Sequence, residues 1–133
     1  MTSKVVYKGN LRMEAEHLQS GAKIITDAPV DNHGKGEAFS PTDTVATALA
    51  SCMLTVMGIK AEAMKIDISG ATASVNKTMA ADPRRISKVE VVIEFTREFE
   101  NKEKKILENT ARNCPVLHSL HPDMEKNISF HYK

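Results

Sequence analysis

The chain has 133 residues, with 18 lysines and arginines against 17 aspartates and glutamates, for a net charge of +1. This length predicts one domain, residues 1–133, that can bury a core. The even charge and the few aromatic residues argue against a nucleic-acid partner. Two cysteines do not make a secreted disulfide scaffold, and the N-terminus lacks the apolar core of a signal peptide. We therefore expect a cytoplasmic protein.

The first part of the chain alternates apolar and polar residues, which is typical of half-buried strands. In Leu11–His17, which follows an extended lead-in, leucine, methionine and alanine alternate with Arg12 and two glutamates. Gln19–Gly21 has the composition of a turn, and Ala22–Thr26 is predicted to be the returning strand. Residues 27–40 then form a loop long enough to suspect a function.

A helix over Thr42–Ala63 is the centre of the predicted fold, because it is apolar nearly all round. Pro41 fits the first turn of a helix, and Asp43 favours the positive end of the helix dipole. The most apolar part, Val45–Ile59, has only fifteen residues, fewer than a membrane span needs. We therefore expect no membrane partner.

The remaining segments predict a strand over 66–75 with a bulge at Gly70, a strand over 88–95, a helix over 100–113, a short helical turn over 116–120 and a strand over 127–132. The element order is β-β-β-α-β-β-α-α-β, an α+β class in which a long central helix packs against antiparallel sheets. One chain offers too few strands to cover a helix that is apolar on all sides. We therefore expect a homodimer that forms through this helix.

The two cysteines are the first candidates for chemistry. Cys52 lies inside the apolar helix, where a lone cysteine is usually a small core residue, and composition alone favours that interpretation. Cys114 directly precedes Pro115. If Pro115 opens a helix, Cys114 is its N-cap, where backbone N–H groups and the helix dipole stabilise a thiolate. This argument makes Cys114 the more acidic thiol.

A metal site is a further possibility for the same region. Cys114, His118 and His121 would offer three zinc-type ligands on one face of a continuous helix. The proline after Cys114 interrupts such a helix, and the fourth ligand would have to come from Cys52, His131 or elsewhere. Solvated or hydrogen-bonded histidines are the better interpretation, and we expect no metal and no other cofactor.

Three charged residues have both a structural and a functional interpretation. Arg12 is either a surface charge in local ion pairs or a cation that lowers the pKa of a nearby thiol and attracts an oxygen-rich substrate. Glu37 and Asp43 flank the start of the central helix, where an acidic residue in the first turn is ordinarily a cap. Sequence spacing leaves both interpretations open.

Three stretches together resemble the OsmC/Ohr family of osmotically inducible protein C and organic hydroperoxide resistance proteins. They are Ser40-Pro-Thr-Asp with the following Ala48-Leu-Ala-Ser-Cys-Met, then Asn113-Cys-Pro-Val, and the early Gly9-Asn-Leu-Arg. The resemblance covers essentially the whole chain. It implies an OsmC-like fold, an intertwined homodimer with central helices back to back, and two sites at the interface.

The resemblance also implies a thiol peroxidase that reduces organic hydroperoxides, and hydrogen peroxide as a further substrate, in oxidative stress defence. The cysteine that matches Cys52 attacks the O–O bond and becomes a sulfenic acid, and the one that matches Cys114 condenses with it to a disulfide. An external thiol donor, a dihydrolipoyl group in Ohr-type enzymes, then reduces the disulfide. Arg12 matches the arginine that holds the first cysteine as a thiolate.

One position departs from the family pattern. A glutamate ten residues before the first cysteine pairs with the arginine in the family, and Thr42 stands there in this chain, with Asp43 beside it. Either Asp43 replaces the glutamate or the arginine is free to move. We predict Cys52, Cys114, Arg12 and Asp43 as catalytic residues. The alternative is a non-catalytic OsmC-like stress or ligand-binding protein with weak or no turnover.

Overall fold

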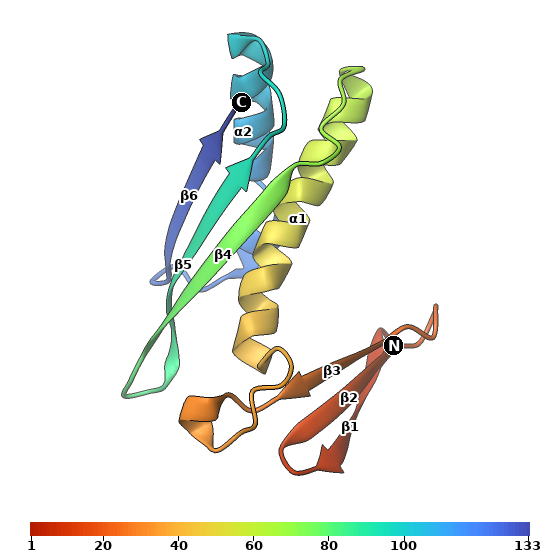
Figure 1. Ribbon diagram of the computed structural model, residues 1–133, viewed down its shortest axis with the longest axis vertical. Coiled ribbons are helices and arrows are strands. Elements are labelled where there is room, and N and C mark those ends of the chain that lie inside the picture. The colour runs from red at the N-terminus through yellow and green to blue at the C-terminus, as the bar shows by residue number, and fades with distance from the viewer. The chain divides into compact units, whose positions relative to one another are not determined.

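The computed structural model describes residues 1–133, and its strands and helices follow the predicted order. The chain forms two compact units, Met1–Val45 and Ala46–Lys133, and each has a three-stranded sheet (Figure 1). The single domain over residues 1–133 stays a prediction.

The first unit is built on an antiparallel meander of β1 (Ser3–Gly9), β2 (Arg12–His17) and β3 (Lys23–Asp27), in that order across the sheet. A short 3-10 helix, η1 (Val30–Asn32), follows β3 in the predicted loop. The meander confirms the strand pair predicted from the alternating pattern, with β1 as the extended lead-in. β2 is the central strand, so its side chains have neighbours on both sides.

One face of this sheet is apolar. Cross-strand pairing places five apolar side chains on it: Val5, Tyr7, Met13, Ala15 and Ile24. Val5 and Tyr7 are each 60% exposed, and Ile24 is 56% exposed. The first unit therefore presents an apolar surface rather than a core of its own.

The central helix α1 (Pro41–Ala63) begins one residue before the predicted start. The Ser40 hydroxyl accepts a hydrogen bond from the backbone N–H of Asp43 at 3.0 Å, and the Asp43 carboxylate accepts one from the Ser40 N–H at 3.0 Å. These two bonds form a capping box, and Pro41 occupies the first helical position, where no N–H is needed.

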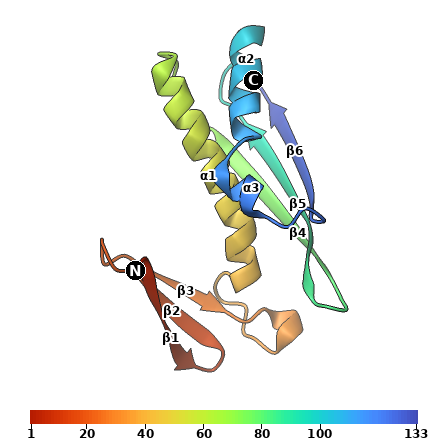
Figure 2. The same ribbon diagram turned by 180° about the vertical axis from the view of Figure 1, so that it is seen from behind.

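The second unit contains the rest of α1, followed by β4 (Thr72–Ala80), β5 (Arg85–Glu94), α2 (Asn101–Ala111), α3 (Pro115–Ser119) and β6 (Glu125–His131). The sheet order is β4-β5-β6. The helices lie on one face of this sheet, which the two opposite views in Figures 1 and 2 both show.

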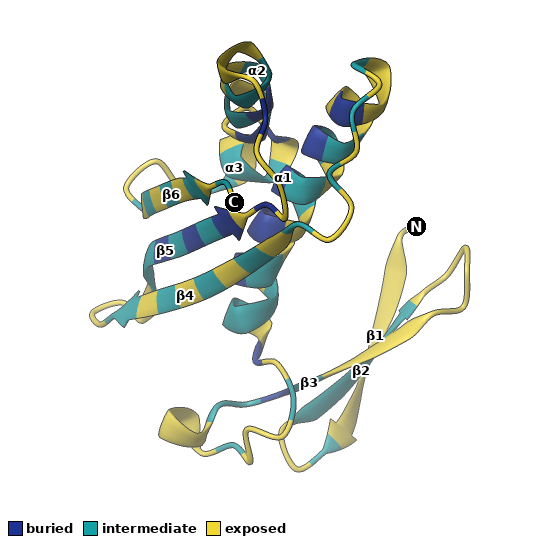
Figure 3. Cartoon of the chain, turned by 45° about the horizontal axis from the view of Figure 1, so that its top comes forward, coloured by how far each residue is buried: buried dark blue, intermediate teal, exposed yellow.

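The core of the second unit lies between α1 and the middle strand β5. In the second half of β5 every second residue is fully buried, namely Val89, Val91 and Ile93. On α1, Leu49, Met53 and Met57 are fully buried and belong to the same cluster. The alternation of buried and more exposed residues along the strands is visible in Figure 3.

The prediction of antiparallel sheets is wrong for one pair of strands. β4 and β5 form an antiparallel hairpin, but β5 and β6 are parallel, with Val91 opposite Ile128. Parallel strands need a crossover connection, and here α2 and α3 supply it. The second sheet is therefore mixed.

The predicted strand over 66–75 is also wrong in its first half. Ile66 and Ile68 lie in a loop, where they pack against the core, and Gly70 adopts a positive φ of 86° in the turn before β4. The register irregularity of this strand lies between Thr78 and Met79 rather than at Gly70. Apolar alternation at 66 and 68 thus reflects burial without strand pairing.

One side of α1 is uncovered. Between Val45 and Ile59 the exposed residues recur at helical spacing, and they are Val45, Ala48, Ser51, Thr55 and Ile59. By length and composition alone α1 could cross a membrane, and the central helix of a globular protein meets the same test. The whole helix runs from Pro41 to Ala63, and the fifteen residues Val45–Ile59 are its most apolar part.

Candidate active site

Cys52 lies on α1 at the edge of its buried face. It directly precedes Met53, which is fully buried, and its own side chain is only partly buried while it packs against the core cluster. The thiol is free. Cys52 is therefore less buried than Met53 beside it.

Cys114 is the N-cap of α3, as the following proline predicted. Pro115 occupies the first turn, and the sulfur of Cys114 accepts a hydrogen bond from the backbone N–H of Leu117 at 3.4 Å. The side chain is fully buried. Cys114 is therefore held in place by the helix start and is shielded from solvent.

The two thiols lie next to each other. Burial raises the pKa of Cys114, the N–H group of Leu117 lowers it, and the hydrogen bond with the neighbouring Cys52 raises it again. The net direction is upward. For Cys114 the loss of hydration therefore outweighs the stabilisation of a thiolate by the helix start. A buried thiol beside a partly exposed one can close a disulfide after the exposed one is oxidised.

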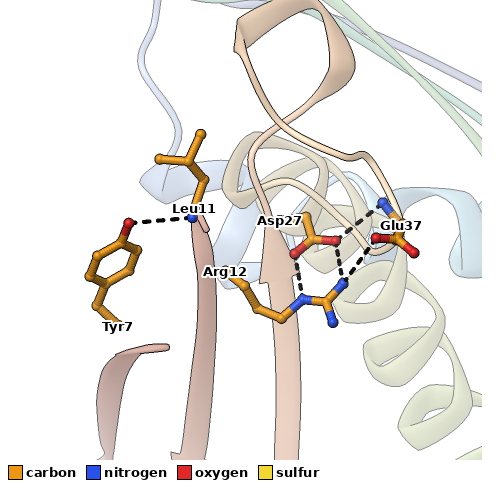
Figure 4. Close-up of polar contacts among 5 residues, drawn as sticks. All are labelled: Tyr7, Leu11, Arg12, Asp27 and Glu37. Carbon is orange, nitrogen blue, oxygen red and sulfur yellow. Dashed lines mark hydrogen bonds and ion pairs between the residues drawn. The ribbon is translucent and has the colours of Figure 1, made fainter. Parts of the chain in front are cut away.

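Arg12 lies in the first unit, where it forms a fork-shaped ion pair with Asp27 (Figure 4). Its Nε donates to one carboxylate oxygen at 2.7 Å and its Nη2 to the other at 2.8 Å. The Glu37 carboxylate lies 3.7 Å from the same Nη2. The hydrogen bond from Arg12 lowers the pKa of Asp27, although burial opposes the shift. An ion pair, one of the two interpretations that the sequence left open for Arg12, is thus present, and the catalytic role of Arg12 stays a prediction.

Asp27 was missed by the sequence argument. It is the last residue of β3 and the direct cross-strand partner of Arg12, and only 3% of its surface is exposed. A buried aspartate at the start of a loop that was suspected of a function was the available signal. The register that places it opposite Arg12 depends on the turn between β2 and β3.

Asp43 makes the capping box with Ser40 at the start of α1. This is the structural interpretation that the sequence left open. Its catalytic role stays a prediction. The structure brings Cys52 and Cys114 together in one unit and Arg12 together with Asp27 in the other.

The alternative metal site does not have the required helix. α3 ends at Ser119, so Cys114, His118 and His121 do not share one continuous helical face. No group of three or more histidine, cysteine, aspartate or glutamate side chains gathers anywhere in the chain. The ring of His121 instead accepts a hydrogen bond from the backbone N–H of Asp123.

The second unit is a mixed α+β fold in which the long central helix contains one cysteine. A second cysteine lies at the start of a later helix, next to the first cysteine. Such a fold and cysteine pair define a class of proteins with two neighbouring thiols. The OsmC-like protein family matches residues 34–129, and the chain belongs to this family. No curated protein matches the chain.

Solved structures of the family resemble the chain over nearly its full length. A candidate osmotic stress induced and detoxification response protein from Psychrobacter arcticus 273-4 is 61% identical, with a TM-score of 0.96 and coverage of 98% of this chain and 96% of the other. An organic hydroperoxide resistance protein OsmC from Legionella pneumophila is 19% identical, with a TM-score of 0.76 and coverage of 97% and 94%. A third, an organic hydroperoxide resistance protein from Elizabethkingia anophelis with bound thiocyanate, is 13% identical, with a TM-score of 0.78 and coverage of 100% and 97%. The last two likenesses establish the fold alone.

Proposed function

We propose that this chain is a cytoplasmic thiol peroxidase that reduces organic hydroperoxides in oxidative stress defence. The observation that carries the proposal is the buried Cys114 thiol beside the partly exposed Cys52. The names of the Legionella and Elizabethkingia proteins, which include organic hydroperoxide resistance, support the choice of substrate class. Hydrogen peroxide is a second substrate of the same chemistry.

The proposed reaction uses both sulfurs in order. The Cys52 thiolate attacks the O–O bond, an alcohol leaves with a proton, and Cys52 becomes a sulfenic acid. The Cys114 sulfur then attacks the oxidised sulfur, and its thiol proton leaves with the hydroxyl as water, which gives a disulfide. An external dithiol, for which a dihydrolipoyl group is the proposed type, returns two electrons and two protons. Arg12 is the proposed residue that favours the Cys52 thiolate, through hydrogen bonds from its guanidinium.

The test is a stoichiometry. Reduced protein mixed with tert-butyl hydroperoxide is expected to consume about one peroxide and to lose about two thiols per chain, with a Cys52–Cys114 disulfide as the product. Cys52→Ser is expected to consume no peroxide. Retention of both thiols under excess peroxide would contradict the proposal.

A homodimer is part of the proposal. Two apolar surfaces support it: the stripe on α1 that ends at Ile59, which is 64% exposed, and the face of the first sheet that contains Val5 and Tyr7. Neighbouring exposed apolar side chains of this kind often mark a protein interface. A second copy of the chain offers the same surfaces and can cover them.

The alternative is a non-catalytic stress or ligand-binding protein of the same fold. Thr42 at the position of the family's glutamate motivates it, and the pairing of Arg12 with Asp27 adds to it, because that arginine is already engaged. This alternative predicts that Cys52→Ser changes no peroxide-linked property and that a ligand co-purifies with the protein. Peroxide turnover that depends on Cys52 would exclude it.

A further inference from the structure

Arg12 has one carboxylate partner that fixes its orientation, and that partner is Asp27. The two residues are opposite each other in the β2–β3 ladder, at the first residue of one strand and the last residue of the other. Two parallel hydrogen bonds, from Nε and Nη2, hold the plane of the guanidinium in a single orientation. A single contact would leave the group free to rotate.

Asp27 is itself held in place by the backbone around it. Its N–H donates to the carbonyl of Phe39 at 3.0 Å, and its carboxylate accepts the N–H of Glu37 at 3.2 Å. Only 3% of Asp27 is exposed. Because these contacts hold the carboxylate in place, the guanidinium that binds it is held in place as well.

Glu37 differs from Asp27 in each of these respects. Its side chain is 61% exposed, and its carboxylate lies 3.7 Å from Arg12, beyond the length of a good hydrogen bond. An exposed pair of this kind contributes little. Glu37 therefore supplies charge near Arg12 but does not fix its orientation.

The fork leaves one edge of the guanidinium available. Asp27 takes Nε and Nη2, and Glu37 lies against Nη2, so Nη1 keeps its N–H groups for another acceptor (Figure 4). The Arg12 side chain is 38% exposed. Two carboxylates beside one guanidinium also leave no surplus of positive charge, so the use of this edge depends on directed hydrogen bonds to an oxygen or sulfur acceptor.

We infer that Asp27 is the positioning residue for Arg12. By holding the guanidinium in one orientation, Asp27 presents its Nη1 edge to the oxygen or sulfur atom that accepts the hydrogen bonds of Arg12 in the reaction. The sequence suggested Asp43 as the carboxylate that pairs with Arg12, and we infer that Asp27 has this role. The carboxylate of Asp43 accepts a hydrogen bond from the N–H of Ser40 in the helix cap. The inference rests on the proposed peroxidase, because Arg12 has its assigned role only there. It assigns a residue from β3, outside all three motifs that carry the resemblance.

The first arm of the test is kinetic. The variants are Asp27→Asn, which keeps the shape and removes the charge, and Glu37→Gln as the matched control from the same network. The second-order rate constant for oxidation of Cys52 by tert-butyl hydroperoxide is measured in a single turnover. We expect Asp27→Asn to lower it roughly a hundredfold, as misplacement of a catalytic group does, and Glu37→Gln to change it about twofold or less. An unchanged rate constant in Asp27→Asn would overturn the inference.

The second arm does not depend on activity. The Arg12 Nε–H resonance, identified by its absence in Arg12→Lys, is followed by proton–nitrogen NMR. It is expected to be sharp and slow to exchange with water in the wild type and in Glu37→Gln, and lost to exchange in Asp27→Asn. A protected resonance in Asp27→Asn overturns the inference. If the wild type consumes no peroxide, the proposed function fails, and this arm still decides whether Asp27 holds the arginine.

Asp27→Glu serves if Asp27→Asn does not fold. It keeps the charge and displaces the carboxylate by one methylene group, so a fall in the rate constant of about tenfold is expected, with a protected but shifted Nε–H resonance. Alkylation of the Cys114 thiol in the native protein is the structural control, because it should match the wild type in each folded variant. A wild-type rate constant in Asp27→Glu contradicts the inference.

Discussion

The thiol of Cys114 is buried at the start of α3 and lies beside the partly exposed thiol of Cys52 on α1. In the proposed reaction Cys52 attacks the peroxide, and Cys114 converts the resulting sulfenic acid to a disulfide. In Cys114→Ser the peroxide reaction is expected to begin normally and to stop at the sulfenic acid, because no second sulfur can condense with it. Excess peroxide should then add a second and a third oxygen to Cys52.

Intact mass spectrometry follows these steps, with the wild type as the control that loses two hydrogens and gains no oxygen. Serine is also a good N-cap, so Cys114→Ser keeps the start of α3. Oxygen addition to Cys52 at the same slow rate in both proteins would show that Cys114 does not resolve the sulfenic acid.

The raised pKa of Cys114 predicts how the stability of the reduced protein depends on pH. A group whose pKa is higher in the folded state stabilises the fold below its unfolded pKa, and this contribution is lost as the pH rises through the folded pKa. The loss should therefore begin above the ordinary thiol pKa of about 8.5.

Urea unfolding of the reduced wild type and of Cys114→Ser at pH 7 and at pH 10 checks this prediction. From pH 7 to pH 10 the free energy of unfolding of the wild type should fall relative to that of Cys114→Ser. A difference that is the same at both pH values would mean that the Cys114 pKa is not raised.

Local sequence rules predicted the surroundings of Cys114. A cysteine before a proline indicates an N-cap, and Cys114 is the N-cap of α3. The capping box at Ser40 and Asp43 follows from an equally local pattern. Such features depend on neighbours within four residues, so the sequence contains them in full.

Features that depend on distant neighbours were not predictable from the same residues. The partner of Arg12 depends on the register between β2 and β3, the parallel pairing of β6 depends on the path through two helices, and the pKa of Cys114 depends on how many side chains cover it. Capping and burial shift that pKa in opposite directions. Only the packed structure shows that burial is the larger effect.

Lowering the pH should reduce the free energy of unfolding of the wild type more than that of Asp27→Asn. The pKa of Asp27 is lowered in the folded protein by its hydrogen bond from Arg12, so its contribution to stability is present above the ordinary aspartate pKa of about 3.9 and is lost as the pH falls below it. Asparagine cannot titrate. The free energies of unfolding of the two proteins should therefore keep a constant difference from pH 6 to about pH 4 and converge below that. If their difference is independent of pH, the ion pair does not lower the pKa of Asp27.

Leu107 tests the core between α2 and the rest of the second unit. Its side chain is fully buried, so Leu107→Ala should lower the free energy of unfolding by about 2–5 kcal/mol through the lost burial and the cavity that remains. Lys105, on the exposed side of the same helix, is the control, and Lys105→Ala should change it by less than about 0.5 kcal/mol. Equal effects in the two variants would mean that α2 does not bury the Leu107 face.

The exposed stripe on α1 tests the proposed homodimer. Ile59 is 64% exposed in the single chain, and a glutamate there would carry its charge into an interface that covers this side of the helix. Sedimentation equilibrium of the wild type is expected to give twice the chain mass, and Ile59→Glu should shift it toward the single-chain mass. Asn109→Glu, an exposed position on α2, is the matched control and should leave the mass of the wild type. If Ile59→Glu keeps the dimer mass, the dimer does not form through α1, and the apolar face of the first sheet becomes the surface to test, with Tyr7→Glu.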